Sequence, residues 1–276
     1  RRRHGDISLH TEITVAPEED VEIRRVRLTN HGSEPRRLRV SSYAEVVLAA
    51  QGRDRRHPAF NKMFIESERL SDVNALLFRR RPRSSGEESL RVAQMLVTAP
   101  DLEATGAYES DRAQFLGRGR TTKAPLAFER ADAEWLSGTT GAPLDPIVAL
   151  GQRVTVEPHT TVELAYLTMA AESREDAIRL MRRYQSWPRI NRAFDQAHAQ
   201  SGVELRNLDL DVTDVQDIMQ LLSVLFYPHR ALRADPRTLA ANRLGQAGLW
   251  RYGISGDYPV LLVRIADEER LPLVRE

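Results

Sequence analysis

The chain has 276 residues, enough for one large domain or two modest ones with a sizeable core. Forty basic residues balance 39 acidic ones, so the net charge of +1 excludes a global attraction to nucleic acid or to an anionic membrane. Without cysteine, disulfides, thiolate metal sites and a cysteine nucleophile are excluded. No run of about 18 apolar residues predicts a membrane span, and the first arginines lead into no signal-peptide hydrophobic region.

Up to Ala171 the sequence mostly follows the period of two that is typical of strands. Apolar and polar residues alternate over residues 7–15, which places one set of side chains on a buried face and the other in water. Turn signals over residues 17–20 and 30–35 separate the first three strands. The remaining expected strands are 21–28, 37–48, 59–65, 74–78, 90–98, 147–156 and 162–168. Many strands with turns and no helices between them predict an antiparallel β-sandwich.

The period changes to that of a helix at Ser173. This serine is a good N-cap, and Glu175 and Asp176 place negative charge in the first turn. Apolar residues then recur at helical spacing as far as Tyr184. A second helix is expected over residues 190–200, where Gly202 would end it.

Two more helices are expected further along. The third covers residues 214–226, with Thr213 as its cap, and Asp235-Pro236 opens the fourth because proline suits the first turn. The buried stripe of the third helix is expected to comprise Ile218, Leu221, Leu222 and Leu225. A glycine-rich loop and a strand over residues 259–265 would follow.

These elements predict a mainly β chain with α: a sandwich over residues 1–171, a helical segment over 172–245, and a last part over 246–276. The last part would hold the glycine-rich loop, the strand and the start of a following region. Residues 271–276 read like the first turn of a helix, and the chain starts almost directly in a strand. We therefore expect a segment of a larger protein.

A family resemblance rests on seven strings that occur in order over almost the whole chain. Together they resemble the cyclic β-1,2-glucan synthases, very large bacterial inner-membrane proteins with glycosyltransferase (family 36) and glycoside-phosphorylase-like (family 94) regions. Any one string alone would be weak. The strings are Thr11-Glu-Ile-Thr-Val15, Arg25-Val-Arg-Leu-Thr-Asn30, Ser42-Tyr-Ala-Glu-Val-Val-Leu48, His57-Pro-Ala-Phe60, Asp111-Arg-Ala-Gln-Phe-Leu-Gly-Arg-Gly-Arg120, Leu144-Asp-Pro-Ile147 and Leu249-Trp-Arg-Tyr-Gly-Ile-Ser-Gly-Asp-Tyr-Pro259.

The resemblance implies a galactose-mutarotase-like supersandwich of the kind that precedes the helical barrel in family 94 phosphorylases. The general acid of those phosphorylases lies in the barrel, and no segment of this chain resembles the barrel. The implied function is therefore a non-catalytic, carbohydrate-associated module that docks on neighbouring catalytic modules and contacts β-1,2-glucan. Two alternatives remain: a fragment of an active glycoside phosphorylase or hydrolase, and a structural spacer without ligand.

The implied location is the cytoplasmic side of the bacterial inner membrane, as part of a larger membrane protein. The implied partners are a β-1,2-glucan oligosaccharide and other modules of the same polypeptide. No cofactor, metal, nucleic acid or direct membrane insertion is expected. Basic clusters at residues 1–4, 53–57 and 78–83 are balanced by acids elsewhere and accompany no nucleic-acid recognition motif, so we interpret them as solvated loops or contacts with other modules.

The first candidate site is the loop that carries Asp111, Arg112, Arg118 and Arg120 around two glycines. Guanidinium groups can bind vicinal hydroxyls and oxyanions in a fixed plane, which favours a sugar or phosphate contact. The alternative is an internal salt-bridge network that holds a long sandwich loop in place.

Two further candidates involve carboxylates. Asp54 and His57 could form a metal or acid/base site only with a third converging group, and the proline after His57 favours a structural role instead. Asp145 could pair with Asp54 or Asp111 as a glycosidase couple, whose carboxyl groups lie about 5–10 Å apart. An aspartate before proline is also a common start of a turn.

The last candidate is the glycine-rich string near the C-terminal end. Trp250, Tyr252 and Asp257 flank Gly253 and Gly256. An aromatic ring can cover the apolar face of a sugar while a carboxylate binds its hydroxyls, so Trp250 and Asp257 suit a carbohydrate surface. Equally, Trp250 could anchor a core, because tryptophan is usually well buried.

Overall fold

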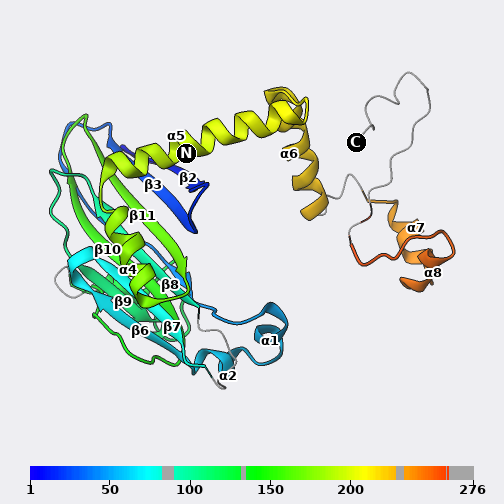
Figure 1. The fold of residues 1–276 in the computed structure, drawn as a ribbon, viewed down its shortest axis with the longest axis horizontal. Coiled ribbons are helices and arrows are strands. Elements are labelled where there is room, and N and C mark those ends of the chain that lie inside the picture. The colour runs from blue at the N-terminus through cyan, green and yellow to red at the C-terminus, as the bar shows by residue number, and fades with distance from the viewer. Residues whose placement is uncertain (83–89, 132–134, 228–232, 259, 261–276) are drawn as a thin grey trace. The chain divides into compact units, whose positions relative to one another are not determined.

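The computed structural model describes residues 1–82, 90–131, 135–227, 233–258 and 260. The chain forms two compact units, residues 1–201 and residues 202–276 (Figure 1). The first unit contains the described strands, arranged in two sheets, and the second unit contains helices.

A seven-stranded antiparallel sheet forms the larger layer of the first unit. Its spatial order is β1-β2-β3-β11-β8-β7-β6, so the long central strands β3 and β11 pair over nine residues. Side chains on both faces of the central strands are buried, because an apolar cluster packs against each face of the sheet. The strands are β1 (Arg2–His4), β2 (Ile7–Val15), β3 (Val21–Asn30), β6 (Ile65–Leu70), β7 (Ala75–Arg80), β8 (Arg91–Thr98) and β11 (Thr161–Ala171).

A smaller four-stranded sheet is built around β10 (Pro146–Val156). Along one edge β10 pairs with β4 (Arg36–Ser41) and then with β5 (Ala44–Glu45), which has only two residues. Along the other edge it pairs with β9 (Ala107–Asp111). The small sheet therefore has fewer strands than the large sheet that it faces, and its edge at β5 is short.

Two apolar clusters lie on the two faces of the large sheet. One is shared with the small sheet and includes Leu28, Leu150 and Leu164. The other lies under α4 (Arg174–Arg183) and the first half of α5 (Trp187–Asn207), where Met181 and Ile190 are fully buried. Burial of this apolar area supplies the main free energy that holds the layers together. Figure 1 shows α4 lying along β11 and β8.

Short helices lie in the connections between strands of the first unit. They are α1 (Gln51–Arg56), α2 (Pro58–Lys62), the 3₁₀ turn η1 (Ser71–Val73), α3 (Arg112–Leu116) and the 3₁₀ turn η2 (Leu126–Glu129). A third apolar cluster, which includes Phe115 and Trp135, packs α3 and η2 on the outer face of the small sheet. Gly151 on β10 makes room for this packing, because a Cβ there would lie 2.6 Å from a methyl group of Leu136.

The second unit consists of helices in its described part. They are α6 (Val212–Phe226), α7 (Pro236–Ala241) and α8 (Ala247–Trp250). Asp211 caps α6 by accepting hydrogen bonds from the amides of Thr213 and Asp214, and the Asp214 carboxylate accepts one from the amide of Asp211. None of the helices in the described ranges has the length and apolar character needed to cross a bilayer.

The structure confirms the predicted fold class, a mainly antiparallel β-sandwich followed by helices. It also confirms Ser173 as the cap of α4, where the Ser173 hydroxyl accepts a hydrogen bond from the amide of Asp176 at 3.0 Å. Asp235 caps α7, with Pro236 in its first turn, as expected. The strand over residues 7–15 is β2 with the same bounds.

Several predicted elements are wrong. Residues 59–65 were expected as a strand, but Pro58 begins α2, because proline favours a first helical position. The strand over residues 37–48 breaks after Ser41, and Gly202 lies inside α5 rather than at its end. A glycine costs a helix only about 1 kcal/mol, which the flanking turns offset.

The third predicted helix also differs in its details. Its cap is Asp211 and not Thr213, because the aspartate carboxylate reaches two amides. Ile218, Leu221 and Leu222 are exposed, so the predicted buried stripe is wrong for these residues. The side chain of Leu225, the strand over residues 259–265 apart from Val260, and the helix start over 271–276 lie outside the described part of the chain.

Candidate functional site

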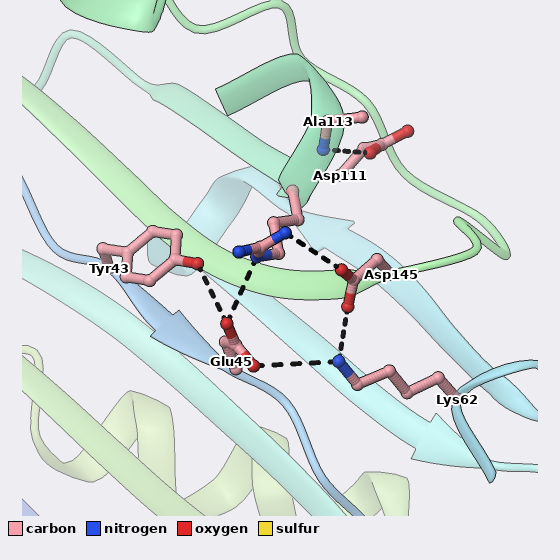
Figure 2. A network of polar contacts seen from close by, with 7 residues as sticks. Tyr43, Glu45, Lys62, Asp111, Ala113 and Asp145 are labelled. Carbon is pink, nitrogen blue, oxygen red and sulfur yellow. Dashed lines mark hydrogen bonds and ion pairs between the residues drawn. The ribbon is translucent and has the colours of Figure 1, made fainter. Parts of the chain in front are cut away.

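Asp111 lies where β9 ends and α3 begins. Its carboxylate accepts a hydrogen bond from the amide of Ala113 at 2.7 Å, so it is the N-cap of α3 (Figure 2). The carboxylate thereby satisfies a helix amide that would otherwise lack a partner. The position of Asp111 is explained by the backbone it caps.

Arg112, the next residue, belongs to a ring of four alternating charges with Glu45, Lys62 and Asp145, which we call the charge ring. The Lys62 Nζ lies 2.5 Å from Asp145 Oδ1 and 3.7 Å from Glu45 Oε2. On the other side, Arg112 Nε lies 3.2 Å from Glu45 Oε1, and Arg112 Nη1 lies 3.5 Å from Asp145 Oδ2. Figure 2 shows the two carboxylates facing each other with one cation on either side.

The fold brings these residues together from distant parts of the sequence. Glu45 ends β5 and is paired with Ile147 of β10, so it lies beside the turn that holds Asp145. Lys62 ends α2, and the amide of Arg112 donates a hydrogen bond to the carbonyl of Asp145 at 3.0 Å. The charge ring thus joins four chain segments at one end of the small sheet.

The electrostatics of the ring favour the charged forms of its two cations, Lys62 and Arg112. Burial alone would lower the pKa of Lys62, but the hydrogen bond to Asp145 and the charges of Asp145 and Glu45 outweigh it and raise this pKa. Burial raises the pKa of Tyr43, whose hydroxyl donates a hydrogen bond to Glu45 at 3.4 Å. The two carboxylates are each in contact with two cations, so both are engaged in structural ion pairs.

Both glycines of the arginine loop adopt left-handed backbone angles, and Gly117 also lies close to another part of the chain. Gly117 and Gly119 have φ angles of 82° and 70°, and a Cβ on Gly117 would lie 3.0 Å from the Cβ of Leu126. Arg120 forms an ion pair with Glu129 at 2.5 Å. Arg118 is exposed and has no hydrogen bond or ion pair within the described ranges.

Asp54 and His57 are not joined by any described hydrogen bond. His57 is exposed and lies between α1 and α2, where its extended backbone ends one helix and starts the next. Asp54 lies in α1, and its Oδ1 is buried without a hydrogen-bond partner. Within the described residues, no group of three histidines or carboxylates has the arrangement needed to hold a metal ion.

The residues of the C-terminal string lie in the second unit. Trp250 and Tyr252 are 64% and 66% exposed. The Trp250 indole donates a hydrogen bond to the carbonyl of Ser255 at 3.3 Å, and Gln246 donates one to Asp257 at 2.8 Å. In the described part of this unit, the Trp250 ring is available to a ligand or to another protein surface.

Sequence analysis missed Glu45 and Lys62 as members of a site, and it missed Glu109 altogether. Glu109 is fully buried, and its carboxylate accepts hydrogen bonds from the amides of Ser110, Asp111 and Ser137 and from the Ser137 hydroxyl. A glutamate inside a strand normally faces water, so the sequence carries no signal for this role. Two members of the ring, Arg112 and Asp145, are candidates from the sequence, and Glu45 lies inside one of the family strings.

Comparison with known proteins decides the family. The model of the glycosyl hydrolase 94 supersandwich domain matches residues 1–187. The chain belongs to the glycosyl hydrolase 94 supersandwich family. A curated relative, the cyclic β-(1,2)-glucan synthase NdvB of Rhizobium meliloti (strain 1021), is 37% identical over 272 residues, which is 99% of this chain. The resemblance stated from the seven strings is thereby confirmed.

The supersandwich chain spans about a tenth of the length of NdvB, since the match covers 10% of that protein. Two solved structures are also similar to it. The polysaccharide lyase BACCELL_00875 has a TM-score of 0.36 at 15% identity, covering 63% of this chain and 21% of the lyase. A putative kojibiose phosphorylase from the human microbiome has a TM-score of 0.34 at 8% identity, covering 80% of this chain and 21% of the phosphorylase.

Proposed function

We propose that the chain is a non-catalytic supersandwich module of a cyclic β-1,2-glucan synthase, and that it contacts the glucan and docks on neighbouring modules of the same polypeptide. The similarity to NdvB over 99% of the chain supports the link to glucan synthesis. A location on the cytoplasmic side of the bacterial inner membrane is part of this proposal. It rests on the family alone.

The state of the carboxylates carries the non-catalytic part of the proposal. Glycoside hydrolysis needs one carboxyl group that donates a proton and a second, free carboxylate on the other side of the bond. Asp145 is held by Lys62 and Arg112, and Asp111 caps α3. Both carboxylates therefore stabilise the fold, Asp145 through the charge ring and Asp111 as a helix cap. This supports a module that binds glucan and does not cleave it.

Exposed planar side chains support a contact with glucan. Arg118 projects from the turn between Gly117 and Gly119 without a partner in the described residues, and a guanidinium group can bind vicinal hydroxyls. In the second unit, the exposed Trp250 ring and Asp257 offer an apolar face and a carboxylate. We propose these residues as sugar contacts, each within its own unit.

The apolar surface of α6 supports docking. Val212, Met219 and Phe226 are 62–70% exposed, an unusual exposure for large apolar side chains on one helix. Because the chain matches only a tenth of NdvB, the occupant we propose is a further module of the same polypeptide.

Titration with linear β-1,2-glucan oligosaccharides tests the proposal. We expect the chain to bind them with a dissociation constant between the micromolar and millimolar range in calorimetry. Arg118→Ala should weaken binding about tenfold at an unchanged melting temperature. Arg153→Ala, an exposed arginine on β10, is the matched control and should bind normally. No heat of binding at millimolar sugar would contradict the proposal and leave the spacer alternative.

A further inference from the structure

The inner face of the large sheet, which faces the small sheet, changes from apolar to polar along its central strands. Side chains two residues apart on a strand share a face, so the change can be followed along each strand. On β3, Leu28 and Val26 belong to the core between the sheets, and the same face continues as Arg24 and Glu22. Likewise Leu164 and Tyr166 on β11 continue as Thr168, and Leu96 on β8 continues as Gln94.

The strand register places these polar residues side by side. Gln94 is paired with Thr168, and Thr168 is paired with Glu22 on its other side. Arg24 lies in the neighbouring row, paired with Tyr166. Since neighbouring strands lie about 4.8 Å apart, the row presents polar groups at regular intervals across three strands.

The small sheet leaves this row uncovered. β4 ends at Ser41, and β5 adds only two residues, so residues 41–44 form a rim above the row. A hollow of 470 Å³ results, within the size range of ligand sites in proteins. Its lining comprises Leu9, Thr11, Glu22, Arg24, Val26, Val40, Ser41, Ser42, Tyr43, Ala44, Gln94, Tyr166 and Thr168. We call this hollow the inter-sheet cleft.

Hydrogen bonds fix the buried side of the cleft. The amide of Leu150 donates to Ser42 Oγ at 2.9 Å, Ser42 Oγ donates to Gln94 Oε1 at 2.5 Å, and Gln94 Nε2 donates to Thr168 Oγ1 at 3.3 Å. Gln94 is only 6% exposed. Its amide has two N–H groups, and within the described residues only one of them has an acceptor. A buried donor without a partner is costly, so a ligand acceptor would complete it.

The charges of the lining select a neutral ligand. Arg24 and Glu22 form an ion pair at 2.6 Å, and they are the charged side chains of the lining. The remaining polar lining consists of hydroxyl groups and the Gln94 amide, while Leu9, Val26 and Val40 supply apolar surface. Hydroxyls and amides that surround an apolar wall suit a sugar ring, which carries hydroxyls at its edge and C–H groups on its faces.

We infer that the inter-sheet cleft binds a sugar residue of an oligosaccharide, with Arg24, Gln94 and Thr168 as hydrogen-bonding residues and Leu9 and Val40 as the apolar wall. The inference rests on the proposed function, which makes β-1,2-glucan the source of the sugar. The cleft is a different place from the arginine loop, because neither Arg118 nor Arg120 is part of its lining.

Backbone amide shifts measured by NMR locate the binding site. The full chain is titrated with linear β-1,2-glucan oligosaccharides and, separately, with cellotetraose. We expect the glucan to shift the amides of Thr11, Glu22, Arg24 and Thr168. Arg24→Ala removes a hydrogen-bond donor, and Ala44→Trp places a large ring in the cleft from its rim. Each variant should weaken binding about tenfold. Arg153→Ala on the outer face of the small sheet should leave the affinity unchanged.

The outcomes separate the cleft from the proposed function. Glucan binding that these variants leave unchanged, with shifts elsewhere, would overturn the cleft and keep the proposed function. Shifts in the cleft with cellotetraose but none with β-1,2-glucan would support the cleft and contradict the glucan assignment. No shift with either sugar would overturn both. Thermal melting checks that each variant is folded. If Ala44→Trp does not fold, Arg24→Ala alone tests the cleft, because the Arg24 side chain is 53% exposed and its removal should not disturb the fold.

Discussion

Lys62 joins the two carboxylates of the charge ring, and its side chain is only 16% exposed. Replacing it with methionine keeps the apolar stem but removes the charge that holds Asp145 and Glu45 in place. Since a hydrogen bond between charged groups stabilises a fold by about 1–3 kcal/mol, we expect Lys62→Met to lower the free energy of unfolding by that amount. Urea denaturation at neutral pH measures the change. Lys62→Arg keeps the charge and should lose less, and equal losses for both variants would show that packing matters and not charge.

The backbone of Gly151 does not adopt a positive φ angle, so its conformation does not require glycine. Glycine is required there because a side chain would not fit. A methyl group there would overlap with the rings and methyls of Trp135 and Leu136, which are buried against β10. We expect Gly151→Ala to lower the free energy of unfolding by about 1–3 kcal/mol.

The matched control is Gly52→Ala in α1, where the nearest atom to a new Cβ is the end of the Arg56 side chain at 3.8 Å. This variant should be unchanged or up to about 1 kcal/mol more stable, because alanine favours a helix. Similar losses in the two variants would argue against a close contact at Gly151.

At the level of elements, the sequence predicts those strands and helices whose own pattern decides them. The alternation in β2 and the capping serine of α4 are local signals, and both predictions are confirmed. The sequence around α2 and β6 gives conflicting local signals, because Pro58 favours a helix start while the residues up to Ile65 favour a strand. The buried Glu109 and the charge ring depend on residues far apart in the chain, so no local pattern predicts them.

Glu19 attaches the helical layer to the turn between β2 and β3. Its carboxylate pairs with Arg189 at 2.9 Å and with Arg183, and its side chain is 10% exposed. Burial alone would raise the pKa of Glu19, but hydrogen bonds from Tyr184, Arg189 and Arg183 outweigh it and hold the pKa below the ordinary value of 4.5. A lowered folded-state pKa means that this stabilisation is present above pH 4.5 and is lost as the pH falls through the folded-state value.

We therefore expect Glu19→Gln to lower the free energy of unfolding by about 1–3 kcal/mol at pH 7. The difference between the wild-type chain and the variant should shrink as the pH falls below 4.5, because the wild-type carboxylate is then protonated as well. Urea denaturation of both chains from pH 7 to pH 3 measures it. A difference that stays constant over this range would show that the ion pairs are not its source.

At the level of the whole molecule, the helices α4 and α5 complete the core of the first unit. Four of their residues, Ala177, Met181, Ile190 and Ala193, and the C-cap Tyr184 of α4 are at most 1% exposed against the large sheet. A sandwich that ended at residue 171 would expose the matching face of β3, β8 and β11 to water. The first compact unit extends to Ser201, which includes these contacts.

The domain boundaries proposed from the sequence, 1–171, 172–245 and 246–276, can be tested by truncation. We expect a chain of residues 1–201 to unfold cooperatively, with a melting temperature within a few degrees of the full chain, because it retains both apolar clusters of the large sheet. A chain of residues 1–171 should lose the cooperative transition and bind the dye ANS, since it exposes one of these clusters. Circular dichroism melting and ANS fluorescence compare the two chains. Cooperative melting of residues 1–171 would instead establish the sandwich as a domain that folds without its helices.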